Sequence, residues 1–171
     1  MEKLKLTLAD RWILSRFNRL ANNVTNYLNT YNFDKAAQDI YEFLWHEFCD
    51  WYIEISKPRL NNNVVESEQE GSAGLHSSRE TVQYLLCDIL EQTLRLLHPF
   101  MPFITEEIWK YLPHEGDSIM LAPWPAYNKA EINEDVENEM QLAQDVITAI
   151  RNVRNEVKIK PSAKVDVCIR G

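Results

Sequence analysis

The sequence predicts a mainly α protein, an antiparallel helical bundle with a truncated small α/β appendix at its C-terminus. Only 4 of its 171 residues are glycine, too few for the turns of a β-sandwich. Apolar residues recur at steps of three and four in five successive segments, as along one face of a helix. The bundle is expected over residues 1–130 and a second unit over 131–171, in which 164–169 alternate like a strand.

Composition restricts the classes of function. The chain is 45% hydrophobic and 11% aromatic, enough for a buried core. Its net charge of −8 excludes a protein that coats nucleic acid indiscriminately, so any nucleic-acid site should be a small basic patch. The cysteines and histidines lack metal-ligand spacing, so no metal site is expected. Because no apolar run has membrane-spanning length and no signal-peptide pattern occurs, we expect a cytoplasmic chain without membrane contact.

The first helix is expected to begin at a capping box formed by Thr7 and Asp10. Its apolar residues then repeat at helical spacing over about two dozen residues. A polar stripe that includes Arg16, Arg19 and Asn23 follows another face. Two interpretations of this stripe stay open: a solvated surface, or a strip of donors suited to phosphates and base edges.

The second helix is expected to be capped by Asp34. Its predicted core face includes Tyr41, Tyr52 and Ile55, and its apolar surface is wider than one stripe, so other helices or a partner should cover it. The helix ends with Lys57-Pro58-Arg59. These two cations are explained either by the helix dipole or by RNA contact, and both interpretations stay open.

Residues 61–76 are polar, so a flexible loop is expected there. A capping box that starts at Ser77 predicts the beginning of the third helix. That helix ends at a corner with two prolines, of which Pro102 suits the first turn of a fourth helix over about 103–112.

The segment around Ile119 is expected to be extended, and Trp124 to close one end of the bundle. A fifth helix is predicted over 133–157, with acidic residues at its start and basic residues, including Arg151 and Arg154, at its end. This polarity matches the helix dipole, and RNA contact is the alternative explanation.

No catalytic motif is recognisable. The sequence lacks a glycine-rich phosphate loop and a nucleophile motif. The adjacent Glu106 and Glu107 point in different directions on a helix and are explained by its N-terminal dipole. The residues alone therefore predict a binding or scaffolding module, without a cofactor of its own.

Ordered motifs spread over nearly the whole chain resemble one family. They are the proline corner His98-Pro-Phe-Met-Pro-Phe-Ile-Thr-Glu-Glu-Ile-Trp109, together with Leu8-Ala-Asp-Arg-Trp-Ile-Leu-Ser-Arg16, Glu47-Phe-Cys-Asp-Trp-Tyr-Ile53, Ala122-Pro-Trp-Pro125 and Ile150-Arg-Asn-Val-Arg-Asn-Glu156. This series resembles the class I aminoacyl-tRNA synthetases for branched aliphatic amino acids and methionine, most closely the valyl branch.

The resemblance implies an anticodon-binding helical domain whose partner is the anticodon region of tRNA(Val). In the family this domain follows a catalytic Rossmann domain of the same polypeptide, which uses ATP with Mg. The family's two ATP-site signatures are absent from this sequence, so amino-acid activation and editing are expected elsewhere in a longer polypeptide. That enzyme is expected to be monomeric.

The resemblance and the positions of charge together give candidate tRNA-binding residues. We expect phosphate or base contacts from Arg16, Arg19, Asn23, Lys57 and Arg59, apolar or stacking contacts from Tyr52 and Ile53 and, with lower rank, contacts from Arg151 and Arg154. Neither a catalytic nor a metal-binding residue is expected in this chain.

Three alternatives stay open at this point. The chain is a related module from an isoleucyl or leucyl enzyme, which reads another anticodon. Or it is a non-enzymatic helical domain that packs its apolar second helix against another protein. A metal-binding four-helix protein is the most distant alternative, because no Glu-x-x-His pairs occur on facing helices.

Overall fold

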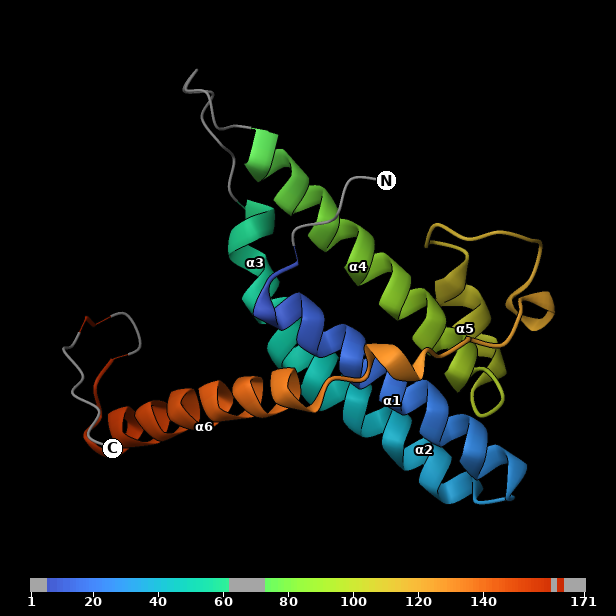
Figure 1. Cartoon of the computed structure of the whole chain (residues 1–171), viewed down its shortest axis with the longest axis horizontal. Coiled ribbons are helices and arrows are strands. Elements are labelled where there is room, and N and C mark those ends of the chain that lie inside the picture. Colours follow the sequence, from blue (N-terminus) through green and yellow to red (C-terminus); the bar gives the residue numbers. More distant parts are fainter. Residues whose placement is uncertain (1–5, 62–72, 161–162, 165–171) are drawn as a thin grey trace.

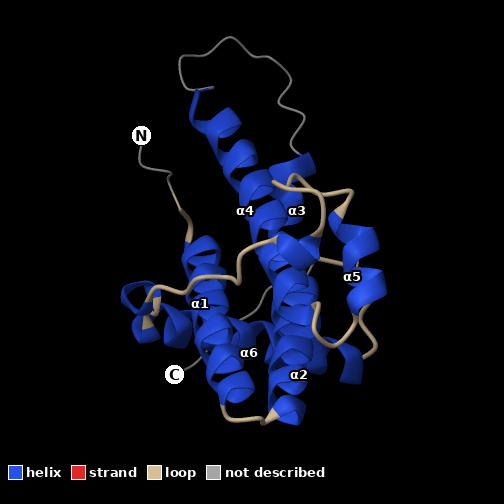
Figure 2. Ribbon diagram, turned by 90° about the vertical axis from the view of Figure 1, so that its right-hand side faces the viewer, coloured by secondary structure: helices blue, strands red, loops and turns tan. Residues whose placement is uncertain are grey.

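The computed structural model describes residues 6–61, 73–160 and 163–164, and within these ranges it is helical and contains no strand (Figure 2). The prediction of a mainly helical fold is therefore confirmed. The elements are α1 (Leu8–Asn29), α2 (Phe33–Glu42), η1 (Phe43–Ile53), α3 (Glu54–Asn61), α4 (Ala73–Leu97), α5 (Pro102–Trp109), η2 (Ile119–Leu121), η3 (Lys129–Glu131) and α6 (Glu134–Glu156).

Helix α1 begins at the predicted capping box. The Thr7 hydroxyl accepts a hydrogen bond from the Asp10 amide at 3.2 Å, and the Asp10 carboxylate accepts one from the Thr7 amide at 2.9 Å. These reciprocal bonds satisfy two amides that have no partner within the helix. The chain turns at Tyr31, which has a φ of 58°, and returns alongside α1 (Figure 1).

The second helical stretch is continuous through α2, η1 and α3, but its middle part, η1, is a π-helix with wider turns. The buried positions Ile40, Phe43, Phe48 and Tyr52 include one step of five, which the wider turn explains. The predicted core face was therefore wrong at Tyr41, which is 55% exposed, and at Ile55, which is 36% exposed.

Two predicted helix starts were wrong. Asp34 lies inside the first turn of α2, after the N-cap residue Asn32, where its charge still favours the helix dipole. Helix α4 begins at Ala73, so Ser77 lies within the helix instead of capping it. Of the predicted loop 61–76, residues 62–72 lie outside the described residues.

The proline corner is confirmed. Pro102 is the first residue of α5, where its missing N–H costs no helical bond. Trp109 is buried at the end of α5 and its Nε1 donates to the Glu91 carboxylate at 2.6 Å. Ile119 packs beside Trp109 in a short 3-10 turn, which corrects the expectation of an extended segment.

The main core is formed by α1, α2 with η1, α4 and the first turns of α6, around Ile13, Phe17, Ile40 and Ile89. At the edge of the bundle Trp124 is 40% exposed, and its Nε1 donates to the Thr25 hydroxyl at 2.9 Å.

Helix α6 starts on the bundle and then leaves it (Figure 1). Asn133 caps it by accepting a hydrogen bond from the Val136 amide at 3.1 Å. Val136 and Met140 are buried, whereas Val153 and Val157 are more than half exposed, so the predicted core face is correct only for the first turns.

Within the described ranges, no helix is both long and apolar enough to cross a membrane. The predicted strand 164–169 lies outside the described residues apart from Lys164, so the α/β appendix and the division at residue 131 stay predictions.

Candidate nucleic-acid interface

The predicted site residues lie in three separate places. Arg16, Arg19 and Asn23 are on α1, and Arg151 and Arg154 are in the distal half of α6. The remaining candidates lie at the end of η1 and in α3: Tyr52, Ile53, Lys57 and Arg59.

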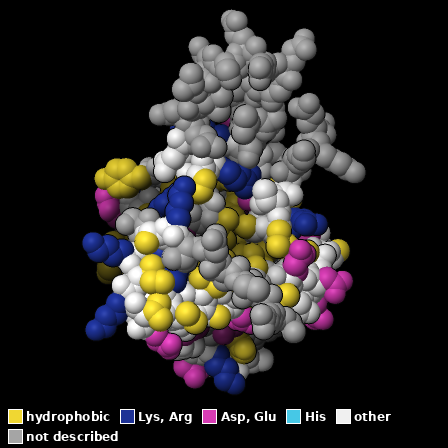
Figure 3. All heavy atoms as spheres, turned by 90° about the vertical axis from the view of Figure 1, so that its left-hand side faces the viewer, with side chains coloured by type: hydrophobic (Ala, Val, Ile, Leu, Met, Phe, Trp, Pro, Cys, Tyr) yellow, Lys and Arg dark blue, Asp and Glu magenta, His cyan; other side chains and the backbone are white. Residues whose placement is uncertain are grey.

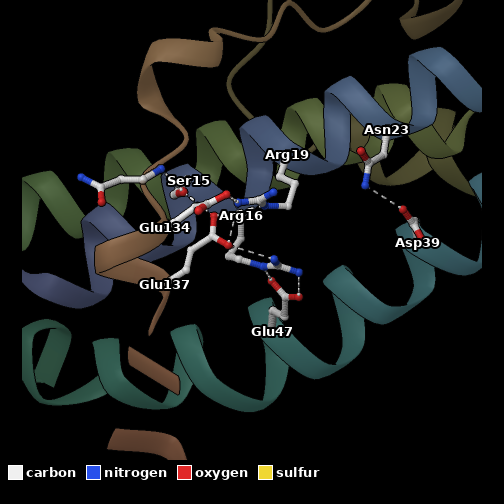
Figure 4. A network of polar contacts seen from close by, with 9 residues as sticks. Ser15, Arg16, Arg19, Asn23, Asp39, Glu47, Glu134 and Glu137 are labelled. Atoms are coloured by element: carbon white, nitrogen blue, oxygen red, sulfur yellow. Dashed lines mark hydrogen bonds and ion pairs between the residues drawn. The ribbon is translucent and has the colours of Figure 1, made fainter. Parts of the chain in front are cut away.

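The three α1 residues line one cleft of about 260 Å³, between α1 and the α2–η1 stretch. The opposite wall is acidic. Arg16 makes a double contact with Glu47, at 2.6 Å from Nη2 and 2.8 Å from Nε, and Asn23 donates to Asp39 at 3.2 Å (Figure 4). The donors of this polar cleft are therefore matched by carboxylates of the same chain.

Glu137 of α6 binds the same arginines from another side. Its carboxylate accepts hydrogen bonds from the Ser15 hydroxyl at 2.5 Å, from Arg16 Nη1 at 3.2 Å and from Arg19 Nε at 3.3 Å. We call Ser15, Arg16, Arg19, Glu47 and Glu137 the Glu137 cluster (Figure 4). It joins α1, η1 and α6.

Electrostatics fix the charge states within this cluster. Burial acts to raise the pKa of Glu137, but hydrogen bonds from Ser15 and Arg19 and the charge of Arg16 hold that pKa below its ordinary value. The hydrogen bond with Glu47 raises the pKa of Arg16 further above its ordinary value, against the effect of burial. Both groups therefore stay charged at neutral pH.

A second cluster, around Asp10, contains two predicted site residues. Arg59 Nη1 lies 2.8 Å from both Asp10 carboxylate oxygens, and the Tyr52 hydroxyl donates to Asp10 at 2.9 Å. Asp10 is completely buried. Burial acts to raise its pKa, but bonds from Arg59, Thr7 and Tyr52 lower it below the ordinary value.

This cluster corrects the expected role of Tyr52. Its ring is completely buried, so it offers no face on which a base can stack. Ile53 is half-buried, and the exposed Lys57 forms an ion pair with Glu54. Contact of Ile53, Lys57 or Arg59 with RNA stays a prediction.

The distal half of α6 presents a different environment. The exposed Arg151 lies over the ring of Trp51, with its Cζ 5.5 Å from the ring centroid. Arg154 Nη2 donates to the carbonyl oxygens of Lys160 at 2.9 Å and Ala163 at 3.0 Å. A groove of about 450 Å³ here is lined by both arginines, Asn155 and three isoleucines, Ile147, Ile150 and Ile159.

The charge balance of this end is positive. We call Arg151, Arg154, Lys158 and Lys160 the distal basic end; residues 147–160 contain one acidic residue, Glu156, besides these four. No carboxylate lies within ion-pair distance of Arg151 in the part of the chain that the structure describes. Figure 3 views this side of the molecule, where Lys and Arg side chains, with Asp and Glu side chains among them, lie around apolar side chains.

Sequence reasoning missed the two carboxylates that decide how the α1 arginines are used. Glu137 was among the acidic residues explained by the helix dipole, and Glu47 appeared only as the first residue of a family motif. They lie 121 and 31 residues from Arg16, so no local spacing signals their contact. Over the ranges described, no three His, Cys, Asp or Glu side chains gather to hold a metal ion.

Comparison with known proteins gives one consistent result. Residues 10–169 match the model of the family described as the anticodon-binding domain of tRNA ligase. The valine–tRNA ligase of Carboxydothermus hydrogenoformans is 46% identical over 165 residues, covering 96% of this chain and 17% of that protein. Those of Aquifex aeolicus and Thermotoga maritima are each 43% identical, over 91% and 100% of this chain and 14% and 18% of their own lengths. The chain thus spans about a sixth of the length of these relatives.

Proposed function

The chain belongs to the family of anticodon-binding domains of tRNA ligases, and from this premise we propose that it recognises the anticodon loop of tRNA(Val) within a valine–tRNA ligase. The observation that carries the proposal is the 46% identity to a valine–tRNA ligase over 96% of the chain. Eight relatives that are 41% to 46% identical to this chain are all named valine–tRNA ligase.

In this proposal the chain positions tRNA for a reaction that takes place elsewhere. ATP-dependent aminoacylation, with Mg, belongs to a catalytic Rossmann domain of the same polypeptide, and the enzyme acts as a cytoplasmic monomer. This chain covers only 17% and 14% of the length of two relatives, which supports the proposal that the reaction takes place in another part of the polypeptide. This chain supplies binding energy and orientation.

We further propose that the distal basic end contacts the RNA backbone. A phosphate that approaches Arg16 or Arg19 has to compete with the carboxylates of Glu47 and Glu137. Oxygens of these carboxylates already lie 2.6 to 3.2 Å from the guanidinium nitrogens. Arg151 has no such competitor among the described residues, so a phosphate gains the full attraction of its charge. This proposal ranks Arg151 above Arg16 and Arg19 as a phosphate contact, whereas the sequence analysis ranked it below them.

The ring beside Arg151 gives this end a second means of binding. Anticodon bases are unstacked enough to lie on aromatic or guanidinium planes, and one such contact contributes about 1–3 kcal/mol. Trp51 is half-buried, and Arg151 lies over its ring. A base that stacks on the outer face of the Arg151 guanidinium would extend this pair. Arg16, Arg19 and Asn23 remain proposed contacts for base edges that enter their cleft.

The test is a titration of the chain with a tRNA(Val) transcript, with transcripts that differ only in the anticodon and with an isoleucine tRNA. We expect tRNA(Val) to bind about tenfold more tightly than the anticodon variants, as loss of one stacked or hydrogen-bonded base implies. Affinity should fall as the salt concentration rises, because the basic side chains of the distal end bind phosphates by charge.

Equal affinity for all transcripts would contradict anticodon recognition. Preference for the isoleucine tRNA would move the chain to the isoleucyl branch. If no RNA binds at low salt, a protein-interaction role replaces the proposal.

A further inference from the structure

Helix α6 has fully buried side chains only in its first turns. In its described residues Val136, Met140 and Gln144 are buried, and beyond Gln144 none is. Arg151 lies 14 positions beyond Glu137, which corresponds to about 21 Å of helix. The direction of α6 at its attachment therefore decides where Arg151 lies.

The apolar contacts alone fix this direction weakly. Val136 and Met140 lie one turn apart on one side of the helix and pack on the bundle, so α6 can tilt about them at little cost in buried area. A tilt of about 10° would move Arg151 by about 4 Å, enough to separate its guanidinium from the Trp51 ring. A directional contact is needed to hold the angle.

We propose that Glu137 is a positioning residue for tRNA binding, which fixes the direction of α6 and so holds Arg151 beside Trp51. This inference rests on the proposed function. Glu137 is suited to the task because its carboxylate receives donors from two successive turns of α1, Ser15 with Arg16 and then Arg19. Hydrogen bonds from several directions resist tilting in a way that apolar contact does not.

Ser15 extends this connection to the backbone. Its hydroxyl donates to Glu137 and accepts a hydrogen bond from the Asn133 amide at 2.8 Å, and the residue is completely buried. Asn133 is the N-cap of α6. The entry of the chain into α6 and the first turn of that helix are thus bonded to the same side chain of α1.

Arg16 brings η1 into the same network. It binds Glu137 with Nη1 and Glu47 with Nη2 and Nε. Because Glu47 and Trp51 lie one turn apart on η1, the network relates α6 to the helix that carries the ring under Arg151. The side chain of Glu137 is only 14% exposed and negative, so it acts through α6 and not by contact with RNA.

The test compares Glu137→Gln with Glu139→Gln. Both changes remove one negative charge from α6, but the side chain of Glu139 is exposed and forms no hydrogen bond or ion pair with any residue that the structure describes. We expect Glu137→Gln to weaken binding of a tRNA(Val) transcript about fivefold, and Glu139→Gln to leave the Kd within twofold. The slope of log Kd against log salt should fall in Glu137→Gln as it does in Arg151→Ala, because the displaced Arg151 loses its phosphate contact.

A double variant separates positioning from general damage. If Glu137 acts through Arg151, Glu137→Gln should weaken binding little further in an Arg151→Ala background. Amide hydrogen exchange should become faster in residues 145–156 of Glu137→Gln and stay unchanged in Glu139→Gln. If Glu137→Gln does not fold, Ser15→Ala removes the two hydrogen bonds that the Ser15 hydroxyl makes with Glu137 and the Asn133 amide, and it should produce the same pattern with a smaller effect.

Three outcomes would overturn the inference alone, given tRNA binding by the unsubstituted chain. They are equal effects of the two glutamine variants, additive effects of Glu137→Gln and Arg151→Ala, and unchanged exchange in α6. Absence of binding by the unsubstituted chain overturns the proposed function as well, so the two failures are distinguishable.

Discussion

In the proximal half of α6, Glu137 binds two arginines of α1 at 3.2 Å, whereas in the distal half Arg151 has a tryptophan ring beside it and no described carboxylate. Residues 134–145 contain five acidic and no basic side chains, and the balance reverses over 147–160. Arg16 and Arg19 of the bundle thus hold elements of the chain together through nearby carboxylates. Arg151, in contrast, is the arginine that we propose to attract an external anion.

The test of this comparison with the largest expected effect is the substitution of Asp10. Asp10→Asn removes the charge opposite Arg59 in a completely buried site, and we expect a loss of about 3 kcal/mol in the free energy of unfolding. Urea denaturation followed by circular dichroism measures it. The matched control is Asp50→Asn, whose exposed side chain pairs with His46 and should change stability by less than about 0.5 kcal/mol. Similar losses in both variants would remove the distinction between buried and exposed pairs.

Arg16→Ala probes the Glu137 cluster itself. It leaves the partly buried carboxylates of Glu47 and Glu137 without their shared donor, and we expect destabilisation by about 2 kcal/mol. At a temperature where the variant is folded, the salt dependence of tRNA binding should match that of the unsubstituted chain. A flatter salt dependence that Arg16→Ala also produces in an Arg151→Ala background would show that Arg16 contacts phosphate directly, one of the two contacts expected from the sequence, and the comparison would then need revision.

Arg151→Ala is the reciprocal test at the distal end. Stability should change by less than about 0.5 kcal/mol, because Arg151 is exposed. Binding of tRNA(Val) should weaken about fivefold, and the slope of log Kd against log salt should fall by about 0.7 to 0.9, as expected for one lost phosphate contact. Lys57→Ala is a useful comparison, because it also removes one exposed cation, but one that forms an ion pair with Glu54. Unchanged affinity after Arg151→Ala would place the RNA elsewhere on the molecule.

The smallest expected effect is the pH dependence of stability. The pKa values of Asp10 and Glu137 are both lower in the folded chain than their ordinary values of 3.8 and 4.5. Their contribution is therefore complete above those ordinary values and is lost as the pH falls through the lower, folded values. Urea denaturation at pH 7, 4 and 3 should show a small loss of stability from pH 7 to pH 4 and a larger one from pH 4 to pH 3. Asp10→Asn should reduce that decrease, and an identical pH profile in the variant would contradict the assignment.

Local signals in the sequence were reliable where one or two turns of chain settle the structure. The Thr7–Asp10 capping box and Pro102 at the start of α5 were predicted correctly, because each depends on neighbours within four residues. Local signals failed where the sequence allows two positions for the start of one helix. The pattern at Ser77 fits a cap, yet the helix begins at Ala73. The wide turns of η1 have no signature in the spacing of apolar residues, so Tyr41 was placed in the core.

The candidate site shows the same division between local and distant information. The basic residues on α1 and α6 are visible in the sequence, and the ordered motifs from Leu8 to Glu156 indicate the family that the comparison establishes. Which arginines are neutralised depends on Glu47 and Glu137, and whether Tyr52 reaches a surface depends on how η1 packs.

The sequence by itself determined the helical composition, the proline corner and the family, because periodicity, capping and motif order are properties of neighbouring residues. Only the tertiary structure decided how each charge is used. Arg16 meets carboxylates 31 and 121 residues away, while Arg151 meets the face of Trp51. Electrostatic energy depends on distance in space and on burial, and neither follows from position along the chain.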